Sequence, residues 1–454
     1  MPKAAFHNLG CKVNEYETEA MKQQLIGAGY EIVPFDETAD VYVVNTCTVT
    51  QMADRKSRQM LHKARQKNPE AVIVAAGCYV QEAGERLLKE DSVDIVVGNN
   101  EKSRLAEILK EYAKAPEVAR QFVPDINTEK DYESLFLEKP VDRTRAFMKI
   151  QDGCNQFCSY CLIPYVRGRV RSRFRKDVLD EAETLASNGV QEIVLTGIHI
   201  SSYGLDWTAR GAAGARTPDA SEQKTNMALL ELIEALGAIE GIRRIRLGSL
   251  EPGIVTGEFA RRLAGCEKVC PQFHLSMQSG CDATLKRMNR RYTTADFAQS
   301  VERLRQVFDR PAITTDIIAG FPGETEREFE MTMAFVESIR FAKTHIFKYS
   351  RREKTVAYDL PDQVPETVKT RRSQALIELD RSMQKAYIKS IIDKKLEVLF
   401  EEKTEMSGMT YWKGHTKENL PSVLASEEDL ENRILNCRYL AAAPDGAILV
   451  AGLK

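Results

Sequence analysis

Three cysteines in one short segment form the pattern in this sequence that is best suited to chemistry. Cys154, Cys158 and Cys161 lie within the stretch Gly-Cys-Asn-Gln-Phe-Cys-Ser-Tyr-Cys, in a C-x3-C-x2-C spacing. A short loop with three thiolates can wrap a cubane iron-sulfur cluster, in which each iron takes one cysteine. Four irons and three local cysteines leave one iron without a protein ligand, so we expect something else to bind there.

Zinc is the main alternative for this triplet. A structural zinc ion takes four protein ligands, and no fourth Cys or His follows at the spacing of a zinc ribbon or finger. A catalytic zinc ion with an open coordination position, or three unrelated thiols, would also satisfy the pattern.

A second set of cysteines is dispersed over the N-terminal part of the chain. Cys11, Cys47 and Cys78 each follow an expected strand by one or two residues and are 36 and 31 residues apart. Successive parallel strands of a doubly wound sheet bring such positions together at its carboxyl edge, where these folds bind ligands. The three can therefore hold a second cluster with one open iron, although buried cysteines after strands are also common for structural reasons. The other cysteines are interpreted as structural: Cys266, Cys270, Cys281 and Cys437.

The elements that must position these cysteines are alternating strands and helices, which predict the α/β class. Short apolar runs predict the strands of a doubly wound parallel domain over residues 1–113: 4–9, 41–45, 72–76 and 94–97. The alternation resumes in residues 140–370 with six further strands: 146–150, 192–196, 243–249, 272–277, 312–318 and 344–349. Six βα units predict a partial (β/α)6 barrel, two units short of eight, with active residues just after the strands.

The remaining segments predict connections and a third domain. A polar stretch over residues 111–142 indicates a linker or an irregular edge, and a Gly/Ala-rich insertion at 208–219 indicates a solvated excursion. Residues 365–392 predict one long charged helix. The strands expected after it have no helices between them and predict a small β-barrel domain over residues 373–454: 396–401, 409–412, 434–439 and 447–450.

Composition and charge set the broad class. The 454 residues are 43% hydrophobic, with 64 Lys plus Arg against 66 Asp plus Glu, so global charge neither demands nor forbids a nucleic-acid partner. The longest nearly apolar stretch, residues 71–80, is half of the roughly 20 residues that a membrane span requires. With no secretory signal either, we expect a cytoplasmic protein, in which ten cysteines indicate metal ligands or reactive thiols rather than disulfides.

Basic segments near the predicted strand ends indicate contacts with RNA. Residues 167–176 hold six positive charges and no acid, and they predict RNA contacts from Arg167, Arg169, Arg171 and Arg173. Basic runs at 55–67 and 286–291 extend this to a phosphate-binding rim, although each run also suits a solvated helix.

The expected C-terminal barrel is slightly acidic, with 8 Lys plus Arg against 11 Asp plus Glu from residue 391 onward. Its contact with RNA is therefore assigned to Lys413, His415 and Lys417, with stacking by Tyr411 or Trp412.

The triplet at residues 154–161 resembles the signature of the radical S-adenosylmethionine enzymes, whose partial barrel matches the six predicted βα units. The resemblance implies that S-adenosylmethionine chelates the open iron and yields a 5'-deoxyadenosyl radical, which abstracts hydrogen from unactivated C-H bonds. It places Tyr160 beside the adenine and the segment Thr196-Gly197 at the methionyl amine. The further cofactor contacts that it implies are Glu251, Gln278 and the close backbone approach of Gly320.

The whole chain resembles the tRNA methylthiotransferases, which combine a cysteine-bearing N-terminal domain, a radical barrel and a TRAM-like barrel. Residues 8–14, 45–50 and 54–59 resemble the branch that modifies N6-threonylcarbamoyladenosine at tRNA position 37. The loop at 349–355 departs from the family pattern, which has a Gly before the Thr.

This resemblance implies methylthiolation at C2 of that base with two S-adenosylmethionine molecules and two 4Fe-4S clusters. It implies the tRNA anticodon stem-loop as partner, and a reduced flavodoxin or ferredoxin as electron donor. The alternatives are methylthiolation of isopentenyladenosine, and a non-catalytic iron-sulfur protein that binds RNA or transfers electrons.

Overall fold

The computed structural model describes residues 1–141, 144–207, 226–406, 408–442 and 448–452. The N-terminal domain is a parallel sheet with strand order β2-β1-β3-β4-β5-β6. Its strands are β1 (Lys3–Asn8), β2 (Glu31–Val33), β3 (Val41–Thr46), β4 (Val72–Gly77), β5 (Ile95–Val97) and β6 (Gln121–Phe122). Its helices are α1 (Lys12–Gly27), α2 (Gln51–Lys67), α3 (Cys78–Leu87), the 3-10 turn η1 (Lys102–Arg104) and α4 (Leu105–Lys114).

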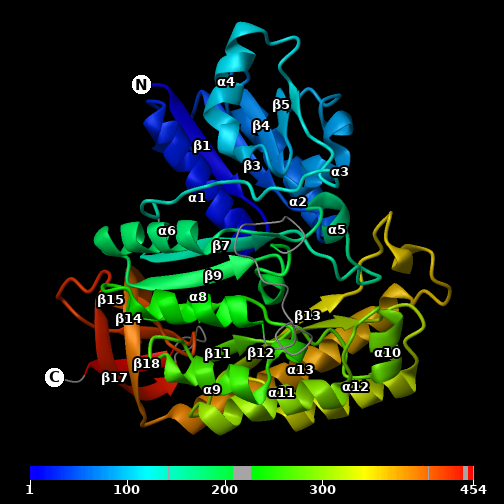
Figure 1. Ribbon diagram of the computed structural model, residues 1–454, viewed down its shortest axis with the longest axis vertical. Coiled ribbons are helices and arrows are strands. Elements are labelled where there is room, and N and C mark those ends of the chain that lie inside the picture. The colour runs from blue at the N-terminus through cyan, green and yellow to red at the C-terminus, as the bar shows by residue number, and fades with distance from the viewer. Residues whose placement is uncertain (142–143, 208–225, 407, 443–447, 453–454) are drawn as a thin grey trace.

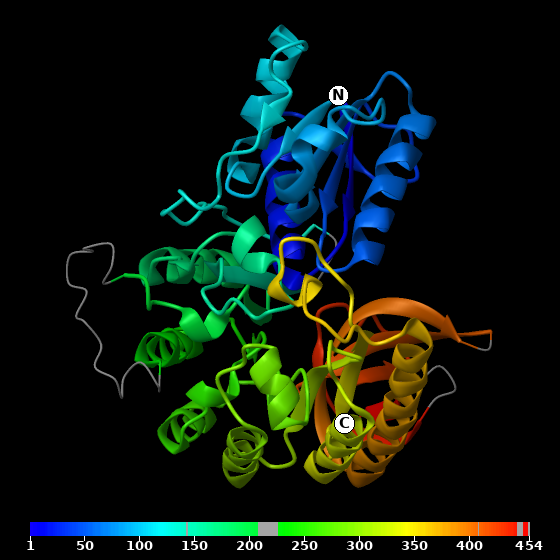
Figure 2. The same ribbon diagram turned by 90° about the vertical axis from the view of Figure 1, so that its right-hand side faces the viewer.

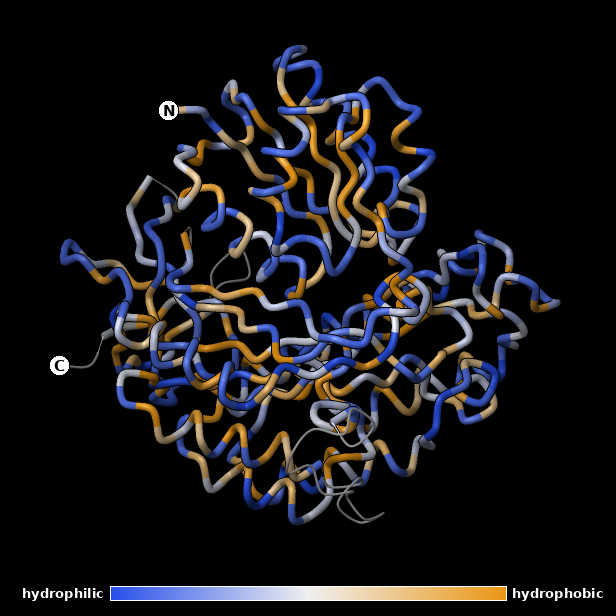
Figure 3. Tube along the Cα trace, turned by 45° about the horizontal axis from the view of Figure 1, so that its top comes forward, coloured by the Kyte–Doolittle hydropathy of each residue, from blue (hydrophilic) through white to orange (hydrophobic). Residues whose placement is uncertain are grey.

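A hydrophobic core lies on each face of this sheet, which explains why the strands carry apolar side chains on both faces. Residues of α2 and α3 pack on one face, and residues of α1 and α4 pack on the other. Figure 3 shows hydrophobic residues gathered along these strands. A parallel sheet that is covered by helices on both faces reads as continuous apolar runs, which is why the sequence predicted it. The doubly wound domain is confirmed.

The central domain is a partial barrel of six parallel strands, all close to the predicted positions. The strands are β7 (Arg145–Asp152), β9 (Glu192–Gly197), β10 (Arg244–Leu247), β11 (Gln272–His274), β12 (Ala312–Ala319) and β13 (Lys343–Lys348). Isolated parallel bridges, Ile245 to Val269 and Leu250 to Leu275, join the two halves of the sheet. A short strand, β8 (Arg171–Ser172), runs antiparallel to the end of β7.

Helices form an outer layer around these strands, as Figure 2 shows. They are α6 (Arg175–Ser187), α8 (Met227–Ala238), α9 (Gly257–Gly265), α10 (Asp282–Arg287), α11 (Thr294–Val307), α12 (Glu326–Ile339) and α13 (Glu366–Ile391). Short helical turns follow four strands: α5 (Ile163–Val166), η2 (Ile200–Ser202), η4 (Pro252–Ile254) and η5 (Val356–Tyr358). The predicted insertion at 208–219 lies outside the described residues.

The C-terminal domain is a small closed barrel with strand order β14-β15-β16-β18-β17. Its strands are β14 (Lys395–Met406), β15 (Met409–Thr416), β16 (Pro421–Leu424), β17 (Ile434–Ala442) and β18 (Ile448–Gly452). The sequence did not predict β16, which pairs antiparallel with β15 but parallel with β18. The predicted domain boundary at 373 falls inside α13, which packs on the central barrel: its Asp380 accepts hydrogen bonds from Thr344 on β13.

In Figure 1 the N-terminal domain lies above the central barrel, alongside β7, and the small barrel lies at its lower left. The small barrel meets the amino ends of the strands, where Arg145 pairs with Glu401 at 2.8 Å and Arg244 pairs with Glu397 at 2.9 Å. The N-terminal domain meets the carboxyl ends, and α1 packs on β7 and β9. The active face of the barrel therefore opens toward the N-terminal domain.

The segment at residues 111–142, predicted to be a linker or an irregular edge, is more buried than a solvated linker. It begins with α4 and continues through β6, which forms an irregular edge of the first sheet, as the sequence allowed. Leu135 and Leu137 are buried, and the hydroxyl of Tyr132 donates to the carbonyl of Lys149 at 2.6 Å. The segment thus packs along the boundary between the two domains. Among the described helices, none combines the length and apolar character needed to cross a bilayer.

Candidate active site

The three dispersed cysteines lie at the carboxyl edge of the N-terminal sheet. Cys11 caps the start of α1 after β1, Cys47 follows β3, and Cys78 begins α3 directly after β4. β1, β3 and β4 are adjacent in the sheet. Cys11 is exposed, whereas Cys47 and Cys78 are buried. The structure therefore brings the predicted set together at one edge of three neighbouring strands.

A buried asparagine and a glycine hold the loops of this triplet in place. The amide of Asn14 donates to the carbonyl oxygens of Leu9 and Thr46, at 2.9 and 3.0 Å, and so ties the end of β1 to the end of β3. Its side-chain oxygen accepts from the Cys11 thiol at 3.7 Å. Gly10 has a φ of +119°, and a Cβ there would lie 3.0 Å from Cβ of Cys47. The close approach of these two loops requires glycine at position 10.

The compact triplet lies in a loop that follows β7. The amide of Cys161 donates to the carbonyl of Cys158, and the amide of Cys154 donates to the carbonyl of Gly168, each at 3.0 Å. Gly153 has a φ of +70°, and a Cβ there would lie 1.9 Å from the carbonyl oxygen of Arg169. Only glycine allows the two arms of this loop to come so close.

One arginine reaches a sulfur atom in each triplet. Nε of Arg167 donates to Sγ of Cys78 at 3.1 Å, and Nη1 of Arg290 donates to Sγ of Cys158 at 3.2 Å. Arg290 also pairs with Glu251 at 2.6 Å. Each triplet therefore has a guanidinium positioned to stabilise a thiolate.

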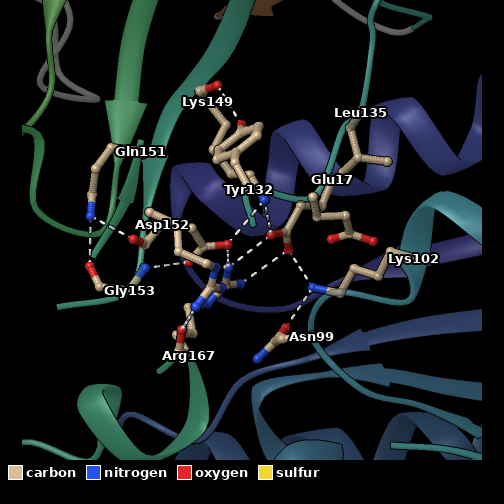
Figure 4. Close-up of polar contacts among 12 residues, drawn as sticks. Glu17, Asn99, Lys102, Tyr132, Leu135, Lys149, Gln151, Asp152, Gly153 and Arg167 are labelled. Atoms are coloured by element: carbon tan, nitrogen blue, oxygen red, sulfur yellow. Dashed lines mark hydrogen bonds and ion pairs between the residues drawn. The ribbon is translucent and has the colours of Figure 1, made fainter. Parts of the chain in front are cut away.

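A buried network of charges connects the two triplets (Figure 4). Arg167 pairs with Glu17 at 2.8 Å and with Asp152 at 3.1 Å. Lys149 pairs with the same two carboxylates, at 2.9 and 3.0 Å, and Lys102 also pairs with Glu17. Glu17 and Lys102 belong to the N-terminal domain, whereas the other three residues belong to the barrel. The network thus lies across the domain boundary.

The thiols fit iron-sulfur clusters by their donor chemistry. Burial, together with the neighbouring thiols of Cys78 and Cys11, raises the pKa of Cys47 to about 12. Burial, together with the thiols of Cys158 and Cys154, raises the pKa of Cys161 to about 12. A bound cluster supplies the positive charge that displaces such protons, and soft thiolate donors suit iron-sulfur clusters. Among the described residues, no three His, Cys, Asp or Glu side chains form a site for a single metal ion.

Two family models match the chain. Residues 3–98 match the "uncharacterized protein family UPF0004", and residues 148–336 match the radical SAM superfamily. The threonylcarbamoyladenosine tRNA methylthiotransferase MtaB of Bacillus subtilis (strain 168) is 39% identical, covering 97% of this chain and 94% of the relative. The chain belongs to the tRNA methylthiotransferases.

Other relatives support this membership. The MtaB of Aquifex aeolicus (strain VF5) is 38% identical, covering 90% of this chain and 95% of the relative. A tRNA-2-methylthio-N(6)-dimethylallyladenosine synthase of Clostridium novyi (strain NT) is 36% identical, covering 88% and 87%. The radical S-adenosylmethionine methyltransferase TsrM of Kitasatospora setae has the same fold, with a TM-score of 0.54 at 16% identity, covering 79% of this chain and 74% of that chain. This methylthiotransferase is a radical S-adenosylmethionine enzyme, and that superfamily implies a 4Fe-4S cluster and S-adenosylmethionine.

The residues predicted to bind the cofactor follow the strands of the methylthiotransferase barrel. Thr196 and Gly197 end β9, Glu251 follows β10, and Gln278 follows β11 with a φ of +68°. Local packing by itself requires glycine at positions 197 and 320. A Cβ at Gly197 would lie 2.9 Å from the carbonyl oxygen of Gln151, and a Cβ at Gly320 would lie 2.4 Å from Cγ of Lys369. Tyr160 lies next to Phe321, with ring centroids 6.5 Å apart.

Most of the arginines predicted to contact RNA are inside the methylthiotransferase. Arg167, Arg171 and Arg173 are at most 3% exposed. Arg171 donates to main-chain carbonyls, and Arg173 pairs with Glu181 at 2.6 Å. The prediction of RNA contacts is wrong for these three, because their side chains are buried inside the protein. Arg169 is exposed and lies over the ring of Phe157.

The small barrel offers fewer RNA contacts than the sequence predicted. Trp412 is 3% exposed, and its indole N-H donates to the carbonyl of Glu428, so it cannot stack on a base. His415 is bound to Glu401 at 2.6 Å. Lys413 is 41% exposed beside Glu402, and Lys417 donates to the carbonyl of Glu267.

Sequence reasoning missed the charged residues that support the two triplets. Lys149 and Asp152 lie in a buried parallel strand. A charged residue in such a strand could have predicted a buried ion pair, because buried charges are paired. Arg290 lies in the basic run at 286–291 that was assigned to the phosphate-binding rim, but its side chain is buried and bonds to Cys158. In the loop at 349–355, Arg352 pairs with Asp54 at 2.5 Å and donates to Thr48, next to Cys47. That loop therefore fastens the barrel to the N-terminal triplet.

Proposed function

We propose that this methylthiotransferase acts at C2 of N6-threonylcarbamoyladenosine at position 37 of tRNA. One S-adenosylmethionine supplies the methyl group and a second supplies the 5'-deoxyadenosyl radical, so that the C2-H of the base is replaced by S-CH3. Support for this base comes from the 38–39% identity to two enzymes named for threonylcarbamoyladenosine.

The observation that carries the proposal is the presence of two cysteine triplets joined by one buried network. Cys154, Cys158 and Cys161 would hold the cluster that cleaves S-adenosylmethionine. Cys11, Cys47 and Cys78 would hold a second 4Fe-4S cluster, where the sulfur to be transferred is methylated. A single cluster would not require thiols at the edge of the first sheet that face the active end of the barrel.

The side chains after the barrel strands would bind the cofactor. We assign Tyr160 to the adenine, Thr196 and Gly197 to the methionyl amine, and Glu251 to polar contacts. Glu251 already lies between Arg290 and His199, at 2.6 and 3.5 Å, so its carboxylate is held in one place. Gln278 and Gly320 complete the set at the ends of β11 and β12.

The tRNA anticodon stem-loop would lie along the exposed basic residues around this face. Arg169 flanks the compact triplet, and Arg55 and Arg58 line a groove of about 720 Å³ along α2, which follows Cys47. Lys413 would add a contact from the small barrel. Exposed guanidinium and ammonium groups attract phosphates without reading sequence. A reduced flavodoxin or ferredoxin would supply electrons, and the cytoplasm would hold both partners.

Methylthiolation of isopentenyladenosine is the second candidate, because a relative named for N(6)-dimethylallyladenosine is 36% identical over most of its length. The alternative of a non-catalytic protein is not supported, since these relatives are enzymes.

Mass spectrometry of tRNA nucleosides from a deletion strain separates the two substrates. We expect loss of the 2-methylthio form of N6-threonylcarbamoyladenosine, restored by the wild-type gene but not by a C78A gene. Loss of the 2-methylthio isopentenyl nucleoside instead would assign the enzyme to the second candidate.

A further inference from the structure

A guanidinium from the barrel reaches into the N-terminal triplet. The side chain of Arg167 is fully buried, and it donates from Nε to Sγ of Cys78 at 3.1 Å. Its Nη2 donates to the side-chain oxygen of Asn14 at 2.8 Å, and that same oxygen accepts from the Cys11 thiol. Asn99 adds a second donor to Sγ of Cys78 at 3.7 Å. Arg167 therefore contacts one predicted cluster ligand directly and a second one through Asn14.

The charges around Arg167 leave room for one more anion. Three buried cations, Arg167, Lys149 and Lys102, pair with two buried carboxylates, Glu17 and Asp152 (Figure 4). A buried charge is strongly destabilising unless it is paired, so an excess cation is unfavourable. A cluster held by Cys78 would bring its net negative charge next to the guanidinium of Arg167.

One further carboxyl lies close to this network. Burial raises the pKa of Glu133, and its carboxylate oxygen accepts from the amide of Ser103 at 2.7 Å. Among the contacts of the described residues, Glu133 bonds to the main chain and makes no hydrogen bond or ion pair with Arg167 or Cys78. It does not take the place beside the guanidinium that Cys78 occupies.

The same network reaches the compact triplet. Asp152, which pairs with Arg167, accepts from the amide of Gly153 at 2.8 Å, one residue before Cys154. The amide of Cys154 donates to Gly168, the residue after Arg167. Arg167 thus lies at the centre of the connection between the two sites.

We propose that Arg167 is a positioning residue for the second cluster: it donates to the sulfur of Cys78, fixes that ligand in place and raises the reduction potential of the cluster bound there. This inference rests on the proposed second cluster. Reduction adds negative charge, which a hydrogen-bond donor and a cation at the ligating sulfur stabilise. Removing the donor makes the cluster harder to reduce.

A chain with only the second cluster tests this without catalysis. In the C154A/C158A/C161A background, we would introduce R167K, which keeps the cation but changes the donor geometry, and R167M, which removes both. An EPR-monitored redox titration measures the midpoint potential after anaerobic reconstitution. We expect a lower midpoint in R167K and a still lower one in R167M.

Arg171 provides a matched control. It is 1% exposed in the same loop, and its guanidinium donates to the main-chain carbonyls of Arg167 and Arg169 rather than to a thiol. R171K should therefore leave the midpoint potential unchanged. Circular dichroism checks that each variant is folded, and if R167M does not fold, R167K decides the test.

The outcomes distinguish the inference from the function on which it rests. If the triple-alanine background retains no cluster, the proposed second cluster is wrong. If it retains the cluster and the Arg167 variants have the parent midpoint and iron content, the inference about Arg167 is overturned. A lowered midpoint in folded R167K, or loss of cluster from folded R167K but not from R171K, supports it.

Discussion

The two cysteine triplets are built in opposite ways. Cys154, Cys158 and Cys161 come from one loop, which is held by hydrogen bonds within the loop and by bonds of Ser159 with Met288 and Ala357 elsewhere in the barrel. Cys11, Cys47 and Cys78 come from three loops, and their arrangement depends on the order of three strands. The first site is local in sequence, whereas the second exists only once the sheet has formed.

The arginines show the same contrast. Arg290 contacts Cys158 from within the barrel and pairs with one carboxylate, Glu251. Arg167 contacts Cys78 from another domain and belongs to a network of five charges. A site assembled from distant parts therefore needs more buried support, and its failure should extend to the domain boundary.

The largest effect should come from removing one cysteine of each triplet. C158A should form neither 5'-deoxyadenosine nor methylthiolated tRNA, because it lacks the site that cleaves the cofactor. C78A should still form 5'-deoxyadenosine but no methylthiolated product. Chromatography of 5'-deoxyadenosine and mass spectrometry of the tRNA measure both. Equal loss of 5'-deoxyadenosine in the two variants would mean that the triplets do not act separately.

The next effect should be on stability. D152N leaves the buried cations Arg167, Lys149 and Lys102 with only Glu17, and breaking such a pair costs about 3–5 kcal/mol. D180N removes an exposed partner of Lys176 on α6 and should change stability little. Urea unfolding measures both. A D152N variant as stable as D180N would contradict the supporting role of the network.

A smaller effect should appear in how the free energy of unfolding changes at low pH. Burial opposes ionisation of Glu17, but Arg167, Lys102 and Lys149 hold its pKa well below 4.5. Its contribution to stability is therefore present above pH 4.5 and is lost as the pH falls below that value. Burial also opposes ionisation of Glu251, but fewer cations, Arg290 and His199, lower its pKa.

We therefore expect the free energy of unfolding to fall less steeply in E17Q than in E251Q between about pH 5 and about pH 3. Urea titrations at several pH values test this. A flatter profile in E251Q would reverse the contrast between the two sites.

The smallest effect should be on tRNA binding. R169A removes an exposed arginine beside the compact triplet, and R58A removes one on α2 beside the dispersed triplet. Each should weaken binding and reduce the slope of log affinity against log salt by about 1, the effect of one phosphate contact. A change in only one variant would place the RNA on that side of the site, and no change in either would contradict the basic rim.

Periodicity and spacing predicted the parts of the molecule that local sequence determines. The six barrel strands and the sheet of the first domain follow from apolar runs, and the positions of Cys11, Cys47 and Cys78 follow from strand ends. β16 was missed because four residues beginning with Pro421 carry too little pattern. Side-chain partners could not be predicted: the run at 167–176 is dense in charge, which favoured a surface, but three of its arginines are buried. Arg167 pairs with Glu17 in another domain, whereas Arg171 donates to the carbonyl of Arg167 and Arg173 pairs with Glu181.

The network at the boundary has a mechanical consequence. Pulling the N-terminal domain away from the barrel would separate Glu17 and Lys102 from Arg167, Lys149 and Asp152 and open a gap that water must fill. On the barrel side, Gly153 packs against Arg169 with no space for a methyl group, so this side of the junction is also tightly packed. The junction is rigid rather than hinged, so we expect the RNA base to reach the site without separation of the two domains.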